Sequence, residues 1–238
     1  MIMTDERFSR TAMLLGEEAL SRLFSSRVML FGLGGVGGYA CEALARAGVG
    51  HLFLCDFDTV SISNINRQIL ADDTTVGQKK TAVAAERVRR IHPSAEVTVA
   101  DLFVDEKNAL DLIASFRPDY IIDAIDAVPS KIALIAAANT LSVPIISCMG
   151  TGNKLDPEKL TIADISKTHT CPLARAVRTR LRAVGISHVD VLFSTEKPIT
   201  PQVGEGEKSV PASVPFVPSV AGLMLGGFVI RRLSGVGT

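Results

Sequence analysis

The chain has 238 residues, of which 47% are hydrophobic, and its 25 basic residues balance 25 acidic ones. This length and apolar content are enough for a large buried core, which excludes a chain that is disordered throughout. Because the formal net charge is zero, no overall field attracts the molecule to nucleic acid or to anionic lipid. A polyanion would therefore have to bind a local basic patch.

No targeting or membrane segment is predicted. The first ten residues are polar and charged and lack the apolar stretch of a secretory signal. The apolar run 220–230 is far shorter than the roughly 20 residues that span a bilayer, so we expect a buried helix there. The cysteines form no Cys-x-x-Cys pair, which predicts reduced thiols in a cytoplasmic protein. They are Cys41, Cys55, Cys148 and Cys171.

Short apolar runs alternate with helical patterns from Arg27 onward, which is typical of βαβ units on a parallel sheet. The pattern predicts an α/β fold with a Rossmann-like, doubly wound, mostly parallel sheet, whose nucleotide-binding half is residues 1–148. The predicted strands are residues 28–31, 51–55, 96–100, 120–122 and 144–148, and the predicted helices are 38–47, 79–90 and 131–140.

Residues 149–238 are predicted to extend this sheet with further strands and helices. The expected elements are strands at 160–165 and 189–194, a basic helix at 172–184 and an apolar helix after Ser219. Residues 196–211 are rich in Pro, Gly, Glu and Lys, which predicts a mobile surface loop. No long linker separates the halves, so we expect residues 1–238 to form a single domain.

A glycine-rich turn follows the first predicted strand. Residues 32–37 read Gly-Leu-Gly-Gly-Val-Gly, a spacing that places backbone N–H groups and a helix N-terminus against phosphate. Asp56 ends the second strand, where dinucleotide-binding proteins hydrogen-bond a ribose hydroxyl, so this motif alone favours an NAD-dependent oxidoreductase. A Walker A loop is excluded, because Gly38 and Tyr39 stand where that loop needs Lys and Ser or Thr.

The next loop carries charges that a dehydrogenase does not use. Residues 56–60 read Asp-Phe-Asp-Thr-Val, residues 63–68 read Ser-Asn-Ile-Asn-Arg-Gln, and residues 76–80 read Val-Gly-Gln-Lys-Lys. Transfer of AMP to a carboxylate brings a second anion to the α-phosphate of ATP, so cations and a metal ion must screen that approach. Arg67 and Lys80 suit this role.

These motifs, followed by Asp-Ala-Ile-Asp at residues 123–126, resemble the E1-like ThiF/MoeB adenylating superfamily. The resemblance implies an enzyme that uses ATP and Mg²⁺, with Asp126 as the metal ligand and Asp56 on the ribose. The residues that it assigns to ATP binding are Gly32, Gly34, Gly35, Gly37, Asp56, Asp58, Asn64, Arg67 and Lys80. The residues that it assigns to catalysis are Arg10, Arg67, Lys80 and Asp126.

The resemblance also implies a homodimer. Residues 7–10 read Arg-Phe-Ser-Arg, which is similar to a family pattern whose last arginine, here Arg10, reaches into the nucleotide site of the other subunit.

Structural roles stay open for the other site residues. Asn64 can cap a turn, Arg67 can be a solvated loop charge, and Lys80 can lie at an exposed helix start. Asp126 can be the N-cap of the following helix.

The second half resembles the tRNA threonylcarbamoyladenosine dehydratase branch of this superfamily. The matching segments are residues 150–157, 164–168, 172–175 and 193–196, and the chain lacks the paired Cys-x-x-Cys motifs common among activators of ubiquitin-like proteins. The branch implies ATP-dependent ring closure of threonylcarbamoyladenosine in the tRNA anticodon loop. The alternatives are an activator of a small ubiquitin-like sulfur-carrier protein and a nucleotide-binding protein without catalysis. A sulfur-transfer protein is a candidate partner.

The predicted helix 172–184 is the candidate tRNA-binding surface. Arg175, Arg178 and Arg182 fall on one side, while Val177, Leu181 and Val184 fall on the other, and Arg180 and Lys167 add charge nearby. The alternative is an ordinary solvated face of an amphipathic helix. Cys171, just before the helix, stands where a capping residue is expected and is predicted to have no catalytic role. The candidate tRNA-binding residues are Lys167, Arg175, Arg178 and Arg182.

Overall fold

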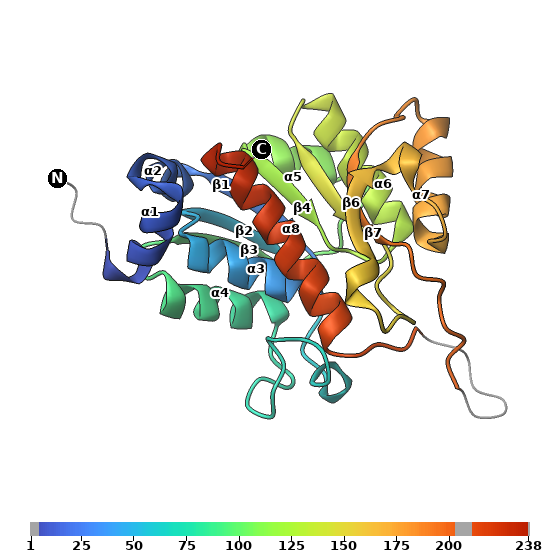
Figure 1. Ribbon diagram of the computed structural model, residues 1–238, viewed down its shortest axis with the longest axis horizontal. Helices are drawn as coiled ribbons and strands as arrows, with labels where there is room; N and C mark the ends of the chain where they lie inside the picture. The colour runs from blue at the N-terminus through green and yellow to red at the C-terminus, as the bar shows by residue number, and fades with distance from the viewer. Residues whose placement is uncertain (1–4, 203–210, 238) are drawn as a thin grey trace.

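The computed structural model describes residues 5–202 and 211–237, and within them the apolar runs form one sheet of seven strands (Figure 1). The strand order is β3-β2-β1-β4-β5-β7-β6. The strands are β1 (Arg27–Phe31), β2 (His51–Cys55), β3 (Glu96–Ala100), β4 (Tyr120–Asp123), β5 (Ile145–Cys148), β6 (Leu160–Asp164) and β7 (Asp190–Ser194). Six of them are parallel and β6 pairs antiparallel with β7, which confirms the predicted mostly parallel α/β sheet.

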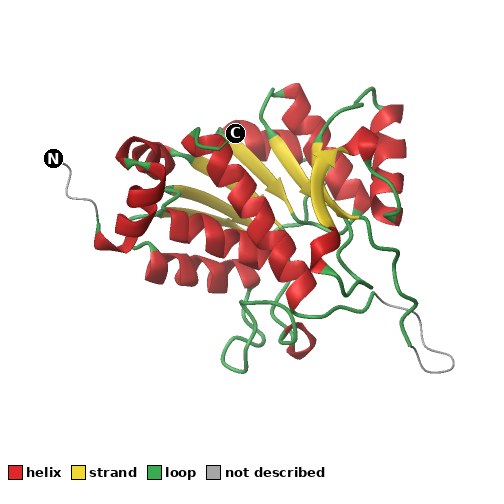
Figure 2. Ribbon diagram, viewed as in Figure 1, coloured by secondary structure: helices red, strands yellow, loops and turns green. Residues whose placement is uncertain are grey.

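The sheet lies between two layers of helices (Figure 2). The helices α2, α3, α4 and α8 cover one face, and α5, α6 and α7 cover the other, as their packing partners show. The helices are α1 (Ser9–Leu15), α2 (Glu17–Ser25), α3 (Gly37–Ala47), α4 (Lys80–Ile91), α5 (Ala109–Phe116), α6 (Val128–Thr140), α7 (Pro172–Ala183) and α8 (Phe216–Ser234). Single 3₁₀ turns occur at η1 (Glu6–Phe8), η2 (Ile62–Asn64), η3 (Pro157–Lys159) and η4 (Ile165–Lys167).

The order of the strands determines where a ligand can bind. The chain runs outward from β1 through β2 to β3, and then returns to place β4 on the other side of β1. In open α/β sheets the crevice at such a reversal, outside the carboxyl ends of the strands, is the usual ligand site. The glycine-rich turn after β1 and the turn after β4 therefore meet at this edge.

The last helix differs from the prediction in length. It begins at Phe216, ahead of Ser219, and its 19 residues make it, among the described residues, the one helix long and apolar enough by composition to cross a bilayer. It packs along α3 through two glycines. A Cβ on Gly222 would lie 2.2 Å from the Val36 carbonyl oxygen, and one on Gly226 would lie 2.6 Å from the Ala43 Cβ. One side of α8 is therefore buried, whereas Leu223 on the other side is 48% exposed, so the helix is only in part the buried helix expected from the sequence.

Three helices were absent from the sequence prediction. These are α1 and α2, which begin the fold and are joined at Gly16 with φ +88°, and α5, which follows β3.

Part of the predicted loop 196–211, residues 203–210, lies outside the described residues. The start of that loop is fixed, because the Glu196 carboxylate accepts hydrogen bonds from the backbone N–H groups of Leu155 and Asp156.

All four cysteines are buried and unpaired in disulfides. Burial raises the pKa of the thiols of Cys41, Cys55 and Cys148 to about 12, which leaves the thiolate form scarce near neutral pH. Cys171 is the N-cap residue of α7, with no hydrogen bond from its side chain to the helix. These environments fit the predicted packing roles.

Candidate nucleotide-binding site

The glycine-rich turn is packed tightly against the end of β4. Gly32 has φ +85°, and a Cβ at this position would lie 2.7 Å from the carbonyl oxygen of Ala124. At Gly37, the first residue of α3, a Cβ would lie 1.7 Å from the carbonyl oxygen of Gly32. Both positions therefore require glycine, and together they bring the turn within van der Waals contact of the segment that leads to Asp126.

Asp56 fixes the other side of the turn. Its carboxylate is buried at the end of β2 and accepts hydrogen bonds from the backbone N–H of Leu33 at 2.6 Å and of Asp58 at 2.8 Å. The Asp58 carboxylate in turn accepts from Nζ of Lys80 at 2.8 Å. Lys80 is only 5% exposed and begins α4, so it is not the solvated helix-start lysine of the alternative prediction. A chain of hydrogen bonds thus links its charge to the turn.

Asn64 has the structural role that the sequence left open. Its side-chain oxygen accepts from the backbone N–H of Ser61 at 3.1 Å, which closes a capping box around η2. Gln68, four residues on, is buried beside the turn, since a Cβ on Gly34 would lie 3.8 Å from its Nε2. Among the described residues its buried Oε1 has no hydrogen-bond partner, although buried polar atoms normally have one.

Arg67 lies against the turn through its aliphatic stem, with its Cγ 3.4 Å from the position of a Cβ on Gly35. Its Nη1 donates to the carbonyl oxygen of Ser63 at 3.0 Å and to Oδ1 of Asn66 at 2.8 Å. The loop therefore orients the guanidinium, which makes Arg67 a preorganised charge beside the turn and not a freely solvated one.

Asp126 is the least constrained of the predicted site residues. The N-cap of α6 is Ala127, and no side chain caps the helix, so the capping role considered for Asp126 is not observed. Asp126 is exposed and forms no hydrogen bond or ion pair with any residue that the structure describes. The described residues contain no group of three or more His, Cys, Asp or Glu side chains that could hold a metal ion by themselves. A single free carboxylate fits Mg²⁺, which commonly takes one or two carboxylates together with nucleotide phosphates.

The sequence did not predict an aromatic pair that lies beside this edge of the sheet. Phe57, directly after Asp56, and Phe103, after β3, are 51% and 48% exposed, and their ring centroids lie 5.4 Å apart. Exposed aromatic rings next to the carboxylate of Asp56 are suited to stacking on a nucleotide base. The position of Phe57 between two aspartates was the available signal.

Arg10 lies on α1, away from these contacts, and forms no hydrogen bond or ion pair with a described residue. The segment before α1 is anchored by Phe8, which is 2% exposed. The Phe8 ring packs edge-on against Phe24 and His92, at centroid distances of 5.2 and 4.8 Å. The structure thus holds the start of α1 in place while it leaves the Arg10 side chain exposed.

His92 makes this anchor dependent on pH. Burial lowers the pKa of its imidazole below the ordinary 6.5, and the positive charge of Arg7 lowers it further. A hydrogen bond with the Val49 backbone and the negative charge of Asp5 raise the pKa but do not cancel the effect of burial. At a pH between the folded and the unfolded pKa, His92 therefore binds a proton in the unfolded chain but not in the folded one. We expect the free energy of unfolding to fall as the pH drops from about 7 to about 5, and to fall less steeply in His92→Phe. Urea unfolding across this range tests it, and equal slopes in both proteins would contradict it.

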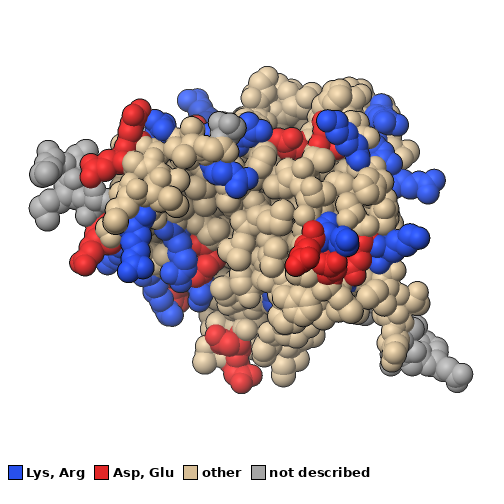
Figure 3. Space-filling model, viewed as in Figure 1, with Lys and Arg blue, Asp and Glu red and all other residues tan. Residues whose placement is uncertain are grey.

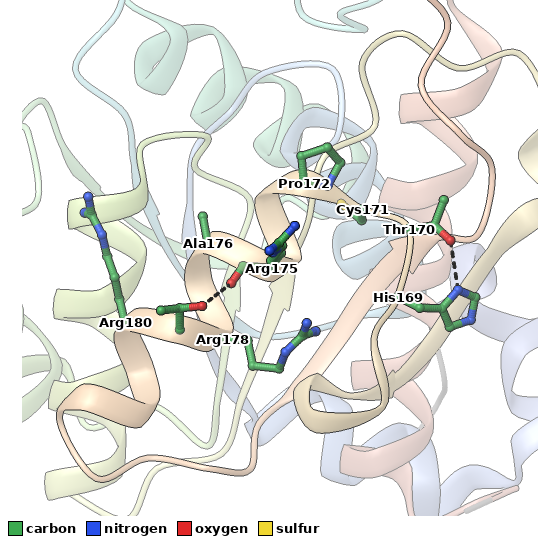
Figure 4. Close-up of a pocket in the computed structure, with 9 residues that line it drawn as sticks. His169, Thr170, Cys171, Pro172, Arg175, Ala176, Arg178 and Arg180 are labelled. Carbon is green, nitrogen blue, oxygen red and sulfur yellow. Dashed lines mark hydrogen bonds between the residues drawn. The ribbon is translucent and has the colours of Figure 1, made fainter.

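Helix α7 packs on the face of the sheet that α5 and α6 also cover. It lines a cavity of about 590 Å³ (Figure 4). Arg175 and Arg182 are exposed, as is Lys167 in η4, whereas Arg178 is half-buried and donates to the backbone oxygen of Thr168 at 2.9 Å. Arg178 therefore ties α7 to the preceding loop. Val177 and Leu181, predicted to share the apolar side of the helix, are buried. Val184, predicted on the same side, is exposed because the helix ends at Ala183. Figure 3 shows Lys and Arg side chains at the end of the molecule that α7 occupies.

The comparisons with known proteins cover the chain almost from end to end. The tRNA threonylcarbamoyladenosine dehydratase of Bacillus subtilis is 44% identical in an alignment that covers 95% of this chain and 94% of that protein. The structure of E. coli tRNA N6-threonylcarbamoyladenosine dehydratase, TcdA, in complex with AMP has a TM-score of 0.89 at 37% identity, over 96% of this chain and 94% of that one. Its complex with ATP has a TM-score of 0.88. The model of the ThiF family matches residues 8–238, and the chain belongs to the ThiF family.

Proposed function

We propose that this protein is an ATP-dependent tRNA threonylcarbamoyladenosine dehydratase. The adenylating chemistry is supported by one observation: at the reversal between β1 and β4 the glycine-rich turn packs against Ala124 and Ile125, the two residues directly before Asp126. The choice of substrate is supported by relatives of that name, which match both halves of the chain.

The residues at the site suit the binding of ATP. Backbone N–H groups of the turn face the phosphates, and Arg67 and Lys80 supply positive charge beside them. Asp56 receives the ribose and the Phe57–Phe103 pair receives the base. Asp126 holds Mg²⁺, which when bound stabilises the charge on the departing pyrophosphate. Asn64 acts by shaping the loop that carries Arg67.

The reaction proceeds in two steps. A carboxylate oxygen of the threonyl group attacks the α-phosphorus of ATP, the new O–P bond forms, and pyrophosphate leaves. The carbamoyl nitrogen of the same group then attacks the activated carbonyl carbon, loses its proton, and AMP leaves as the ring closes. Since this second attack is intramolecular, positioning supplies most of what it needs and no covalent enzyme intermediate is required. The high pKa of the thiols of Cys41, Cys55 and Cys148 agrees with this scheme.

The second subunit of a homodimer completes the site in this proposal. Arg10 is exposed, and on the same helix Met13 and Leu14 are 86% and 82% exposed. Large apolar side chains with this exposure, next to an arginine without a partner among the described residues, suit a contact with another copy of the chain. The close packing of α8 on α3 suits a protein that works in the cytoplasm.

The exposed face of α7 is proposed to bind the tRNA backbone. We expect the double substitution Arg175→Glu, Arg182→Glu to raise the dissociation constant for tRNA by roughly tenfold and to lower its salt dependence, with the affinity for ATP unchanged. Arg178 is spared because it anchors the helix to Thr168.

The matched control for that experiment is Arg89→Glu, Lys107→Glu, which makes the same change in charge at exposed positions on other elements. Filter binding at fixed ionic strength measures both variants. Equal weakening by the two variants would show a general charge effect, and unchanged tRNA binding by the α7 variant would remove this surface from the proposal.

The second candidate function is activation of a small ubiquitin-like sulfur-carrier protein, with a sulfur-transfer protein as partner. The shared adenylating site favours it, but the chain lacks the Cys-x-x-Cys pairs that such activators commonly carry. One assay separates the two functions. We expect AMP to form from ATP when threonylcarbamoylated tRNA is added, and not when a carrier protein ending in Gly-Gly is added. The reverse result would favour the carrier function, and no AMP with either substrate would indicate a protein without catalysis.

A further inference from the structure

A buried polar network lies directly beneath the turn that carries Asp126. Asp123 ends β4, Lys131 is in the first turns of α6, and Ser147 is in β5 in register with Asp123. All three side chains are 0% exposed. Lysine and aspartate are almost never buried this completely unless they are paired, so the sequence had no means of showing that Lys131 points into the protein.

The three side chains satisfy one another. Nζ of Lys131 donates to Oδ2 of Asp123 at 2.9 Å and to Oγ of Ser147 at 3.2 Å. The Ser147 hydroxyl donates to the same Oδ2 at 2.5 Å. The network therefore joins β4, α6 and β5 at their ends nearest the nucleotide site.

The remaining oxygen of Asp123 controls the turn itself. Its Oδ1 accepts from the backbone N–H of Ile125 at 3.0 Å, and Ile125 is the residue before Asp126. The preceding residue is held as well, because the N–H of Ala124 donates to the carbonyl oxygen of Phe31 at 2.8 Å. Since Asp126 makes no contact of its own with a described residue, the direction of its side chain depends on these backbone bonds.

Stability alone does not account for such a network. Replacing a buried ion pair by apolar residues of similar volume is often neutral or stabilising, because removal of two charges from water opposes their attraction. A buried network next to a functional carboxylate does, however, fix one geometry of the backbone above it.

We propose that Asp123, Lys131 and Ser147 form a positioning network that holds the β4–α6 turn so that the Asp126 carboxylate is aimed at the metal ion bound with the nucleotide. This inference rests on the proposed function, in which Asp126 holds Mg²⁺. None of the three residues contacts substrate, so all of them act through Asp126.

The test replaces the ion pair as a unit, Asp123→Val with Lys131→Met, which avoids leaving one buried charge without its partner. Binding of Mn²⁺ in the presence of a non-hydrolysable ATP analogue is measured by electron paramagnetic resonance. We expect the dissociation constant for Mn²⁺ to rise by about tenfold, while the affinity for the analogue without metal changes by less than about twofold. Unchanged affinity for Mn²⁺ would overturn the proposal, even if the variant melts at a lower temperature.

Single serine substitutions give a milder test if the double variant does not fold. Ser147→Ala is expected to weaken Mn²⁺ binding by about threefold. Its matched control is Ser194→Ala at the end of neighbouring β7, since Ser194 is also 0% exposed but lies outside the network. Equal effects of the two substitutions would overturn the proposal.

The same titration separates this proposal from the proposed function. If Asp126→Asn weakens Mn²⁺ binding, the assignment of the metal to Asp126 stands, and Asp123→Val with Lys131→Met should add little in that background because both act through one carboxylate. Additive effects would overturn the positioning role. If Asp126→Asn leaves Mn²⁺ binding unchanged, the metal assignment in the proposed function fails, and the positioning network fails with it.

Discussion

Replacing Asp126 by asparagine is expected to lower the rate of AMP formation by roughly 10³-fold while it changes the affinity for ATP by only a few-fold. The carboxylate is exposed, forms no hydrogen bond or ion pair with a described residue, and directly follows the segment that packs on the glycine-rich turn. Asparagine keeps its shape without its charge. The charge matters most when pyrophosphate departs, so the loss should fall on kcat more than on binding. Single-turnover measurement of AMP release with threonylcarbamoylated tRNA gives both quantities.

The matched control for Asp126→Asn is Asp111→Asn. Asp111 is also exposed but lies in α5, away from the glycine-rich turn, and its substitution should leave the rate within about twofold. A loss of ATP affinity equal to the loss of rate would indicate that Asp126 serves in binding only. Full activity of Asp126→Asn would remove it from the site.

Gly37→Ala is expected to lower the free energy of unfolding by about 3 kcal/mol and to raise the dissociation constant for ATP at least tenfold. The added Cβ would lie 1.7 Å from the carbonyl oxygen of Gly32, a backbone atom that cannot move without displacing the whole turn. Because the turn also packs on Ala124, the displacement would reach the segment that precedes Asp126. Urea unfolding and ATP titration calorimetry measure the two effects.

Gly227→Ala is the matched control for Gly37→Ala. Gly227 lies in α8, and a Cβ there meets nothing within 4 Å, so alanine should be neutral or should stabilise the helix by up to about 1 kcal/mol. Equal destabilisation by the two substitutions would show that the effect at Gly37 is not caused by the contact with Gly32.

The sheet and its central turn were predictable because their signals are local. Buried parallel strands appear as short apolar runs, and the predicted strands agree with the observed ones to within one or two residues. The glycine spacing predicted the strand–turn–helix that the structure shows. By contrast, α1, α2 and α5 have 7 to 9 residues each, too short for helical periodicity to be separated from chance, and they are stabilised by packing.

The candidate site was predictable in its residue types but not in their partners. The motifs identified Lys80, Arg67 and Asp126, whereas the contact of Lys80 with Asp58 and the stem of Arg67 on Gly35 depend on how the loop folds back. Lys131 shows the limit most clearly. A lysine in a helical pattern is normally solvated, and only the pairing of Asp123 with Ser147 across neighbouring strands creates its buried partners.

The most direct test of the site is titration calorimetry of the wild-type protein with Mg²⁺ and a non-hydrolysable ATP analogue, and separately with NAD⁺. We predict saturable binding of the ATP analogue, lost on substitution of Arg67 or Lys80 by alanine, and no heat with NAD⁺. Binding of NAD⁺ at this turn, with the ATP analogue ignored, would contradict the adenylating site.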